Sequence, residues 1–119
     1  MQIKDFKELT VWQKSMKLAA EVYRITKKLP KDELFGLTNQ LRRAAVSIPS
    51  NIAEGNGRDS TKEYLRFLYI ARGSRSEVET QLLLCVELGY LKESDIEFVL
   101  GLSTEVAKML NTIISKFKE

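Results

Sequence analysis

The sequence predicts an all-α fold, an antiparallel up-down-up-down four-helix bundle. First, only two prolines and six glycines occur in 119 residues, a composition that favours helices. Second, apolar residues recur at spacings of three and four in four long segments, and no strand-like alternation competes with them. Third, the connections between these segments are short, about 3–5 residues, which makes successive helices antiparallel neighbours. We expect residues 1–119 to form a single domain.

The first two helices are expected at about residues 10–29 and 33–56. Thr10, followed three residues later by Gln13, forms a capping-box pattern that marks the first helix start. Pro30 ends that helix, and glycines at the end of the second segment end the second helix.

The third and fourth helices are expected at about residues 60–89 and 94–117. Each opens on a serine with a glutamate three residues later, which again matches the capping box; the pairs are Ser60 with Glu63 and Ser94 with Glu97. The fourth segment also has a core row at alternating spacings of three and four, formed by Ile96, Val99, Ser103, Val106, Leu110, Ile113 and Phe117.

The segment Gln40–Gly55 has the rhythm of a helix although Pro49 lies inside it. Proline removes a backbone donor and crowds the preceding turn, so a helix that keeps it has a specific shape to hold. One helical face is apolar, with Leu41, Ala45, Ile48 and Ile52. The opposite face carries Arg43, Ser47, Ser50 and Glu54. Our candidates for a polar network are Gln40, Arg43, Ser47, Asn51, Glu54 and Glu77.

Apolar side chains surround the third expected helix near its end, over residues 82–88, and the first helix carries two adjoining apolar stripes. One bundle cannot cover so much apolar surface, so we expect self-association, as a closed symmetric ring or dimer. The simpler alternative is that a few leucines are exposed without consequence. The candidate oligomer contacts are Leu83, Leu84, Leu88, Leu18 and Val22.

The residue types that most often catalyse reactions or bind metals are scarce. There is no histidine and one cysteine, Cys85, which argues against histidine general bases, zinc sites and Cys-His nucleophiles. No Gly-rich phosphate-binding motif is present. We therefore expect no enzyme, catalytic residue, cofactor or metal. The charged start MQIKDFKELT and the lack of an apolar stretch of about 20 residues predict a cytoplasmic protein without a membrane partner.

The net charge of +3 is small, but its excess lies in residues 1–32, with eight Lys/Arg and four Asp/Glu. Such a bias is typical of a solvated helix face, and the sharper alternative is contact with nucleic-acid phosphates. Arg75 falls in an apolar row, where Glu79 one turn later is its expected partner. Our candidates for phosphate contact are Arg42, Arg43, Arg58, Lys62, Arg66 and Arg72.

The chain resembles the four-helix-bundle proteins encoded within intervening sequences of bacterial 23S rRNA genes. The matching pieces are Leu9–Gln13, Leu37–Gly55 with Arg58, Ala71–Ser74 with Glu77, and Leu88–Leu91. The resemblance implies a ring-shaped homo-oligomer, a pentamer. It also implies similarity to the accessory variability determinant proteins of diversity-generating retroelements, which pentamerise and bind nucleic acid through a basic surface. Arg75 departs from the family pattern, because a more neutral residue is expected there.

Two functional hypotheses follow. The leading one is a non-enzymatic, oligomeric helical bundle that binds RNA or another structured nucleic acid through its basic residues. The alternative is a scaffold whose oligomer docks a partner protein such as a polymerase. In that case the polar row on the second helix holds helices in register.

Overall fold

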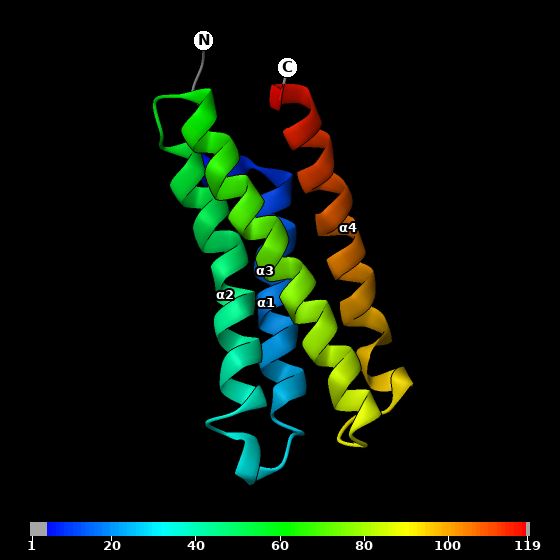
Figure 1. The fold of residues 1–119 in the computed structure, drawn as a ribbon. Coiled ribbons are helices and arrows are strands. Elements are labelled where there is room, and N and C mark those ends of the chain that lie inside the picture. Colours follow the sequence, from blue (N-terminus) through cyan, green and yellow to red (C-terminus); the bar gives the residue numbers. More distant parts are fainter. Residues whose placement is uncertain (1–4, 119) are drawn as a thin grey trace.

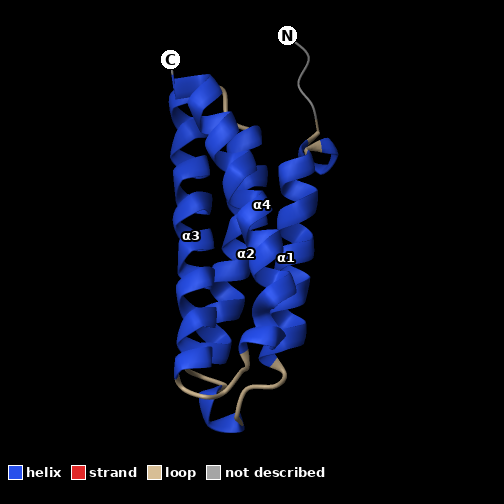
Figure 2. Cartoon of the chain, turned by 90° about the vertical axis from the view of Figure 1, so that its right-hand side faces the viewer, coloured by secondary structure: helices blue, strands red, loops and turns tan. Residues whose placement is uncertain are grey.

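The structure, a computed structural model, describes residues 5–118. Within that range the chain forms helices and connections and no strand (Figures 1 and 2), which confirms the expected all-α class. The α-helices are α1 (Thr10–Thr26), α2 (Leu37–Asn56), α3 (Thr61–Glu87) and α4 (Glu93–Lys118), and two short 3-10 helices are η1 (Phe6–Glu8) and η2 (Lys31–Glu33).

The four α-helices pack side by side into a rod of 49 × 23 × 21 Å. Both α1 and α3 contact α2 and α4. The α1–α2 and α3–α4 connections lie at one end of the rod, and the α2–α3 connection lies at the other end (Figure 1). No helix within residues 5–118 is long and apolar enough to cross a membrane.

The hydrophobic core runs along the centre of the bundle. Each helix contributes side chains without exposed surface, among them Leu18, Leu41, Leu68 and Leu110. Leu18 and Val22 were expected on an outer face that contacts a second copy. Both are instead fully buried in the core, because the stripe of α1 that carries them packs against α2 and α4, while Met16 and Tyr23 of the adjoining stripe remain 45% and 42% exposed.

The core row of α4 follows the expected spacing for most of its length. Its first five members are buried, including the polar Ser103. Near the end of the helix, Ile114 takes the buried place that was expected for Ile113. Phe117 is 39% exposed and packs edge-on against the ring of Tyr64 on α3.

Two helix boundaries differ from the expected ones for local reasons. The first helix ends at Thr26 rather than near residue 29. The second begins at Leu37 rather than near residue 33, because Gly36 has a non-helical backbone with φ −112° and ψ −114°. The Glu33 carboxylate accepts the Leu37 N–H at 3.0 Å and thereby satisfies a free donor in the first turn of α2.

Of the three expected capping boxes, only one has a serine or threonine hydroxyl that accepts a backbone N–H of the first helical turn. Ser60 Oγ accepts the Glu63 N–H at 3.1 Å at the start of α3. Thr10 does not cap α1, whose preceding residue makes no side-chain cap; Gln13 Nε2 donates instead to the Lys7 carbonyl at 2.9 Å. The fourth helix begins at Glu93, one residue before the expected cap.

Candidate nucleic-acid interface

Most arginines are already paired with a nearby carboxylate. Four of the seven arginines form an ion pair with a glutamate three or four residues away, a spacing that adds helix stability where both partners are helical; of the four, Arg58 lies just beyond the end of α2. The pairs are Arg24 with Glu21, Arg58 with Glu54, Arg66 with Glu63, and Arg75 with Glu79.

Arg42 and Arg43 on α2 lack such partners. The Arg42 guanidinium lies 4.8 Å from the centre of the Tyr23 ring, and its Nε donates to Thr26 Oγ1 at 2.9 Å. These two contacts orient the side chain while its terminal nitrogens keep donors for an anion. Arg43 is exposed and makes no hydrogen bond or ion pair with any residue in the described range. The two adjacent guanidiniums therefore keep their positive charge available.

A surface depression surrounds this arginine pair. It has a volume of about 510 Å³ and is lined by Tyr23, Asn39, Arg42, Arg43, Val46 and Ser47. Its lining contains guanidinium, amide and hydroxyl donors and no carboxylate. Arginine forks match phosphate oxygens in geometry as well as in charge. The depression can therefore hold a phosphate group.

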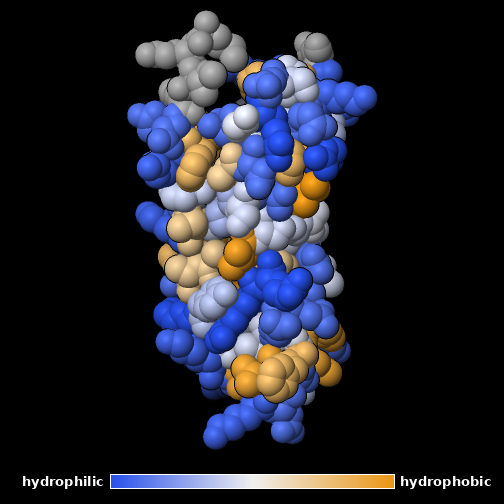
Figure 3. Space-filling model, turned by 90° about the vertical axis from the view of Figure 1, so that its left-hand side faces the viewer, coloured by the Kyte–Doolittle hydropathy of each residue, from blue (hydrophilic) through white to orange (hydrophobic). Residues whose placement is uncertain are grey.

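An apolar groove continues from the depression between α1 and α2. It has a volume of about 480 Å³ and is lined by Trp12, Met16, Ala19, Ala20, Tyr23, Val46, Pro49, Ser50 and Ala53. Tyr23 and Val46 line both features, so the groove and the depression form one continuous surface. Figure 3, which looks onto the left-hand side of Figure 1, shows apolar surface in patches next to strongly hydrophilic surface.

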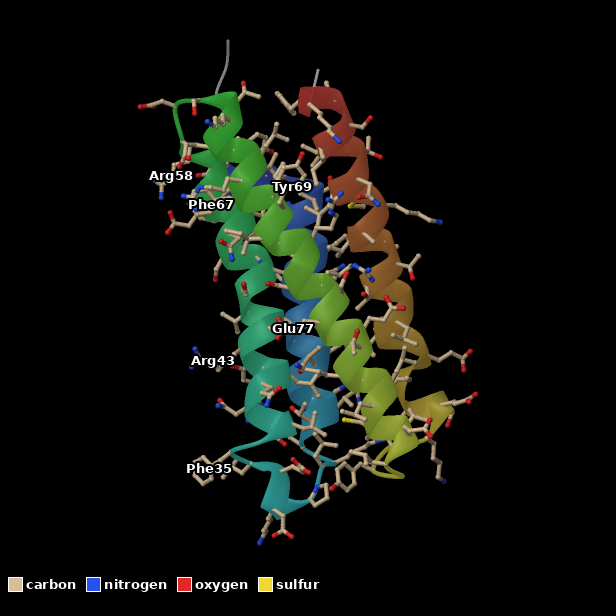
Figure 4. All side chains as sticks on the ribbon, in the orientation of Figure 1. Phe35, Arg43, Arg58, Phe67, Tyr69 and Glu77 are labelled. Carbon is tan, nitrogen blue, oxygen red and sulfur yellow. The ribbon has the colours of Figure 1, made fainter. Side chains whose placement is uncertain are left out.

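Of the other candidate cations, only Arg58 adjoins this surface. It lines a third depression, of about 600 Å³, that shares Ser50 and Ala53 with the groove but also contains the carboxylate of Glu54. Arg58 and Arg66 place their guanidiniums 4.7 and 4.4 Å from the centre of the Phe67 ring, at the turn from α2 to α3, while Arg43 lies farther along α2 and points away from the bundle (Figure 4). Lys62 is exposed at the same turn.

Carboxylates neutralise two of the cations at the α2–α3 turn, Arg58 and Arg66. Glu54 pairs with Arg58 and Glu63 pairs with Arg66. The hydrogen bond from Arg66 holds the pKa of Glu63 below its usual value. The guanidiniums of Arg58 and Arg66 therefore offer an anion little free charge, whereas Lys62 forms no ion pair with any described residue.

Arg72, the sixth candidate, faces α4. Its Nη1 donates to Asn111 Oδ1 at 3.2 Å, and its guanidinium lies 5.1 Å from the centre of the Tyr69 ring. The six cations expected to contact phosphate thus lie in three separate places, of which only the Arg42–Arg43 pair lines a depression without an acidic residue.

The expected polar network is present only in part. Ser47 and Ser74 join their hydroxyls at 2.9 Å between α2 and α3, and Asn51 Nδ2 donates to the Ser47 hydroxyl and carbonyl at 2.9 and 2.7 Å. Further along the same helix pair, Gln81 Nε2 donates to Gln40 Oε1 at 3.3 Å.

Three expected members lie outside this network. Glu54 pairs with Arg58, and the side chains of Arg43 and Glu77 make no hydrogen bond with any described residue. Sequence reasoning missed Ser74 and Gln81, which are buried on α3. Their separation of seven residues places them on one helical face, and this was the available signal.

Arg75 is held inside the bundle by several partners. Its Nη1 contacts both Glu79 and the Ser103 hydroxyl on α4, the latter at 3.0 Å, which confirms the ion pair expected from the sequence. Its side chain is only 15% exposed, and its Nε is buried without an acceptor. Arg75 therefore acts as a structural link between α3 and α4.

Several large apolar side chains remain on the surface. Leu83, Leu84 and Leu88 on α3 are 48%, 42% and 51% exposed, as the oligomer hypothesis requires. The sequence analysis did not single out Phe35, which is 90% exposed in the α1–α2 connection and projects away from the bundle (Figure 4). Its neighbour Leu34 is 50% exposed.

The described residues contain no group of three or more His, Cys, Asp or Glu side chains that could hold a metal ion. Cys85 is fully buried, and burial, with a smaller contribution from the charge of Glu33, raises the pKa of its thiol to about 11. A thiol in this state is a weak nucleophile at neutral pH. Cys85 is therefore a residue of the hydrophobic core.

Comparison with known proteins places this bundle in a family. No curated protein matches the chain. Its structure is similar to the crystal structure of a protein of unknown function from the S23 ribosomal protein family of Bacteroides thetaiotaomicron, with a TM-score of 0.82 and 29% sequence identity, over 88% of this chain and 98% of that one. The model of the 23S rRNA-intervening sequence proteins matches residues 7–112. The chain therefore belongs to the 23S rRNA-intervening sequence protein family.

Proposed function

We propose that this chain is a non-enzymatic, cytoplasmic RNA-binding protein, an antiparallel up-down-up-down bundle that works as a ring-like homo-oligomer of five copies. The pairing of Ser47 with Ser74 and of Gln40 with Gln81 supports the antiparallel arrangement, because the residue number falls along α2 from the first pair to the second while it rises along α3. The observation that carries the RNA-binding proposal is the Arg42–Arg43 pair, which lines a depression without carboxylates.

The free charge of this pair favours it over the other cations as a phosphate contact. A phosphate that binds Arg58 or Arg66 must compete with a glutamate that is already in place. A phosphate that binds Arg42 or Arg43 displaces no carboxylate. Charge-assisted hydrogen bonds from arginine are about twice as strong as neutral ones, so the unpaired arginines contribute most of the binding energy.

A comparison of two double variants tests this proposal. Arg42→Gln/Arg43→Gln and Arg58→Gln/Arg66→Gln remove the same net charge, and circular dichroism checks that both remain folded. We expect the first variant to bind a fluorescein-labelled RNA hairpin about tenfold or more weakly in anisotropy titrations at low salt, and the second to bind within about threefold of the unmodified protein. Equal losses in the two variants, or no binding of the unmodified protein, contradict the proposal.

A second candidate function is a scaffold whose oligomer docks a partner protein such as a polymerase. The exposed leucines at the end of α3 support it, because adjacent leucines with about half of their surface in water are suited to a protein contact. Leu83→Glu/Leu84→Arg should lower the mass measured by light scattering without loss of helicity. If the mass is unchanged, these leucines lie outside the contact between copies. A protein partner that is recovered after nuclease treatment favours the scaffold over RNA binding.

A further inference from the structure

The groove between α1 and α2 exposes more apolar surface than the packing of the bundle requires. Met16, Tyr23 and Val46 along it are 45%, 42% and 42% exposed. The small side chains of Ala20 and Ala53 keep the space between these larger residues open. The groove is therefore a preformed apolar channel on the surface.

Trp12 is one of the side chains of α1 that line this groove. Its ring packs edge-on against Phe6, with ring centres 5.3 Å apart, so its position is fixed by the segment that precedes α1. Trp12 is also the single tryptophan of the chain. The tryptophan fluorescence of the protein therefore comes from Trp12 alone and changes when a ligand enters the groove.

The charged end of the surface selects the kind of ligand. Apolar residues alone would accept any apolar occupant, but Tyr23 and Val46 connect the groove to the depression of Arg42 and Arg43. Neither lining contains an acidic side chain. An occupant that complements both parts has flat apolar groups next to anionic groups, and unpaired nucleotides have both.

We infer that the RNA bound by this chain is single-stranded, with unpaired bases in the α1–α2 groove and phosphates on Arg42 and Arg43. This inference rests on the proposed RNA binding. In a duplex the base faces are stacked and the grooves expose edges only, so a duplex presents phosphates but no flat apolar group. From Asn39 to Ala53, α2 is about 21 Å long. Successive stacked nucleotides of one strand lie about 3.4 Å apart. The surface is several times longer than this spacing, so it is long enough for several nucleotides.

The experiment compares three probes of equal length on the full chain: a 12-nucleotide oligouridine RNA, the same RNA annealed to its complement, and an abasic ribose-phosphate strand. We expect the oligouridine to bind at least about tenfold more tightly than the other two, because base stacking on apolar and aromatic side chains contributes about this much per base. We also expect the Trp12 emission to change with oligouridine and to stay constant with the abasic strand.

Two matched variants locate the effect in the groove. Met16→Glu places a carboxylate in the groove, and Ile70→Glu makes a similar change at a side chain of similar exposure, 40%, on α3. We expect Met16→Glu to weaken oligouridine binding about tenfold or more, because it repels phosphate and blocks the bases, while Ile70→Glu changes it by less than about threefold.

The outcomes separate this inference from the proposal beneath it. If the abasic strand binds as tightly as oligouridine and Trp12 emission does not respond, the groove holds no bases, although RNA binding through Arg42 and Arg43 remains. If no probe binds at low salt, RNA binding itself fails. If Met16→Glu lowers the oligomer mass and leaves oligouridine affinity unchanged, a second copy of the chain covers the groove, and the inference is overturned.

Discussion

Gly55 in the last part of α2 is the residue whose replacement tests the packing of α2 on α3 most sharply. It is buried, and a Cβ atom at this position would lie 2.9 Å from Phe67 Cβ and 3.3 Å from the Tyr64 carbonyl oxygen. Both atoms are fixed to the α3 backbone, so neither can swing aside. Gly55→Ala therefore forces the two helices apart or distorts their ends.

The expected magnitude follows from two opposing effects. Overpacking in a closely packed region costs about 1–3 kcal/mol, whereas alanine gains up to about 1 kcal/mol over glycine in a helix. The net effect is a loss of about 1–2 kcal/mol of the free energy of unfolding. Gly101 on α4 is the matched control, since a Cβ there meets no atom within 4 Å, and Gly101→Ala should stabilise the protein by about 0.5–1 kcal/mol.

Urea unfolding followed by far-UV circular dichroism measures both variants in the same assay. The same chemical change should shift the midpoint down for Gly55→Ala and up for Gly101→Ala. If Gly55→Ala is as stable as the unmodified protein while Gly101→Ala is more stable, the close approach of α2 and α3 at Gly55 is refuted.

Three further predictions concern the buried and paired groups. Arg75→Met should lower the free energy of unfolding by about 1–3 kcal/mol, because it removes one partner of the ion pair and leaves the buried Ser103 hydroxyl without its donor; an unchanged urea midpoint contradicts this. The thiol of Cys85, with its pKa raised to about 11 by burial, should react with a thiol reagent at about pH 8 only as fast as the chain unfolds, and immediate reaction of the native protein argues against it. The hydrogen bond from the Lys92 N–H is the largest cause that lowers the pKa of Asp95, and the hydrogen bond from the Lys28 side chain is the next. The ionised Asp95 carboxylate therefore stabilises the fold fully above the ordinary pKa of 3.8. This stabilisation is lost as the pH falls through the lowered pKa of the folded protein. Urea midpoints measured against pH should therefore fall less steeply in acid for Asp95→Asn.

The helices were readable from the sequence because apolar spacing reports the buried face directly. The spacing does not say how many neighbours cover that face. Leu18 and Leu84 both lie in apolar segments, yet Leu18 is fully buried and Leu84 is 42% exposed. Both α1 and α3 pack against α2 and α4, so the difference is that Leu18 lies on the inward face of its helix and Leu84 on the outward face. The start of α2 was missed because it depends on the Glu33 carboxylate folding back onto a backbone N–H.

The candidate site was less readable, because it depends on which charges are already paired. The pairing of Arg66 with Glu63 follows from their spacing of three on one helix, so it could have been predicted; Arg58, just beyond the end of α2, pairs with Glu54 four residues before it. The contact of Arg42 with Thr26 joins two different helices and could not. The groove was missed because the residues that line it repeat at the same spacing as core residues.

The salt dependence of RNA affinity tests the central claim most directly, that Arg42 and Arg43 neutralise phosphates. The affinity for one single-stranded RNA is measured over a series of salt concentrations for the unmodified protein and for Arg42→Gln/Arg43→Gln. Each phosphate neutralised on a single strand contributes about 0.7 to the slope of log affinity against log salt. The account predicts that the slope of the double variant is shallower by about 1.4, and two identical slopes would contradict it.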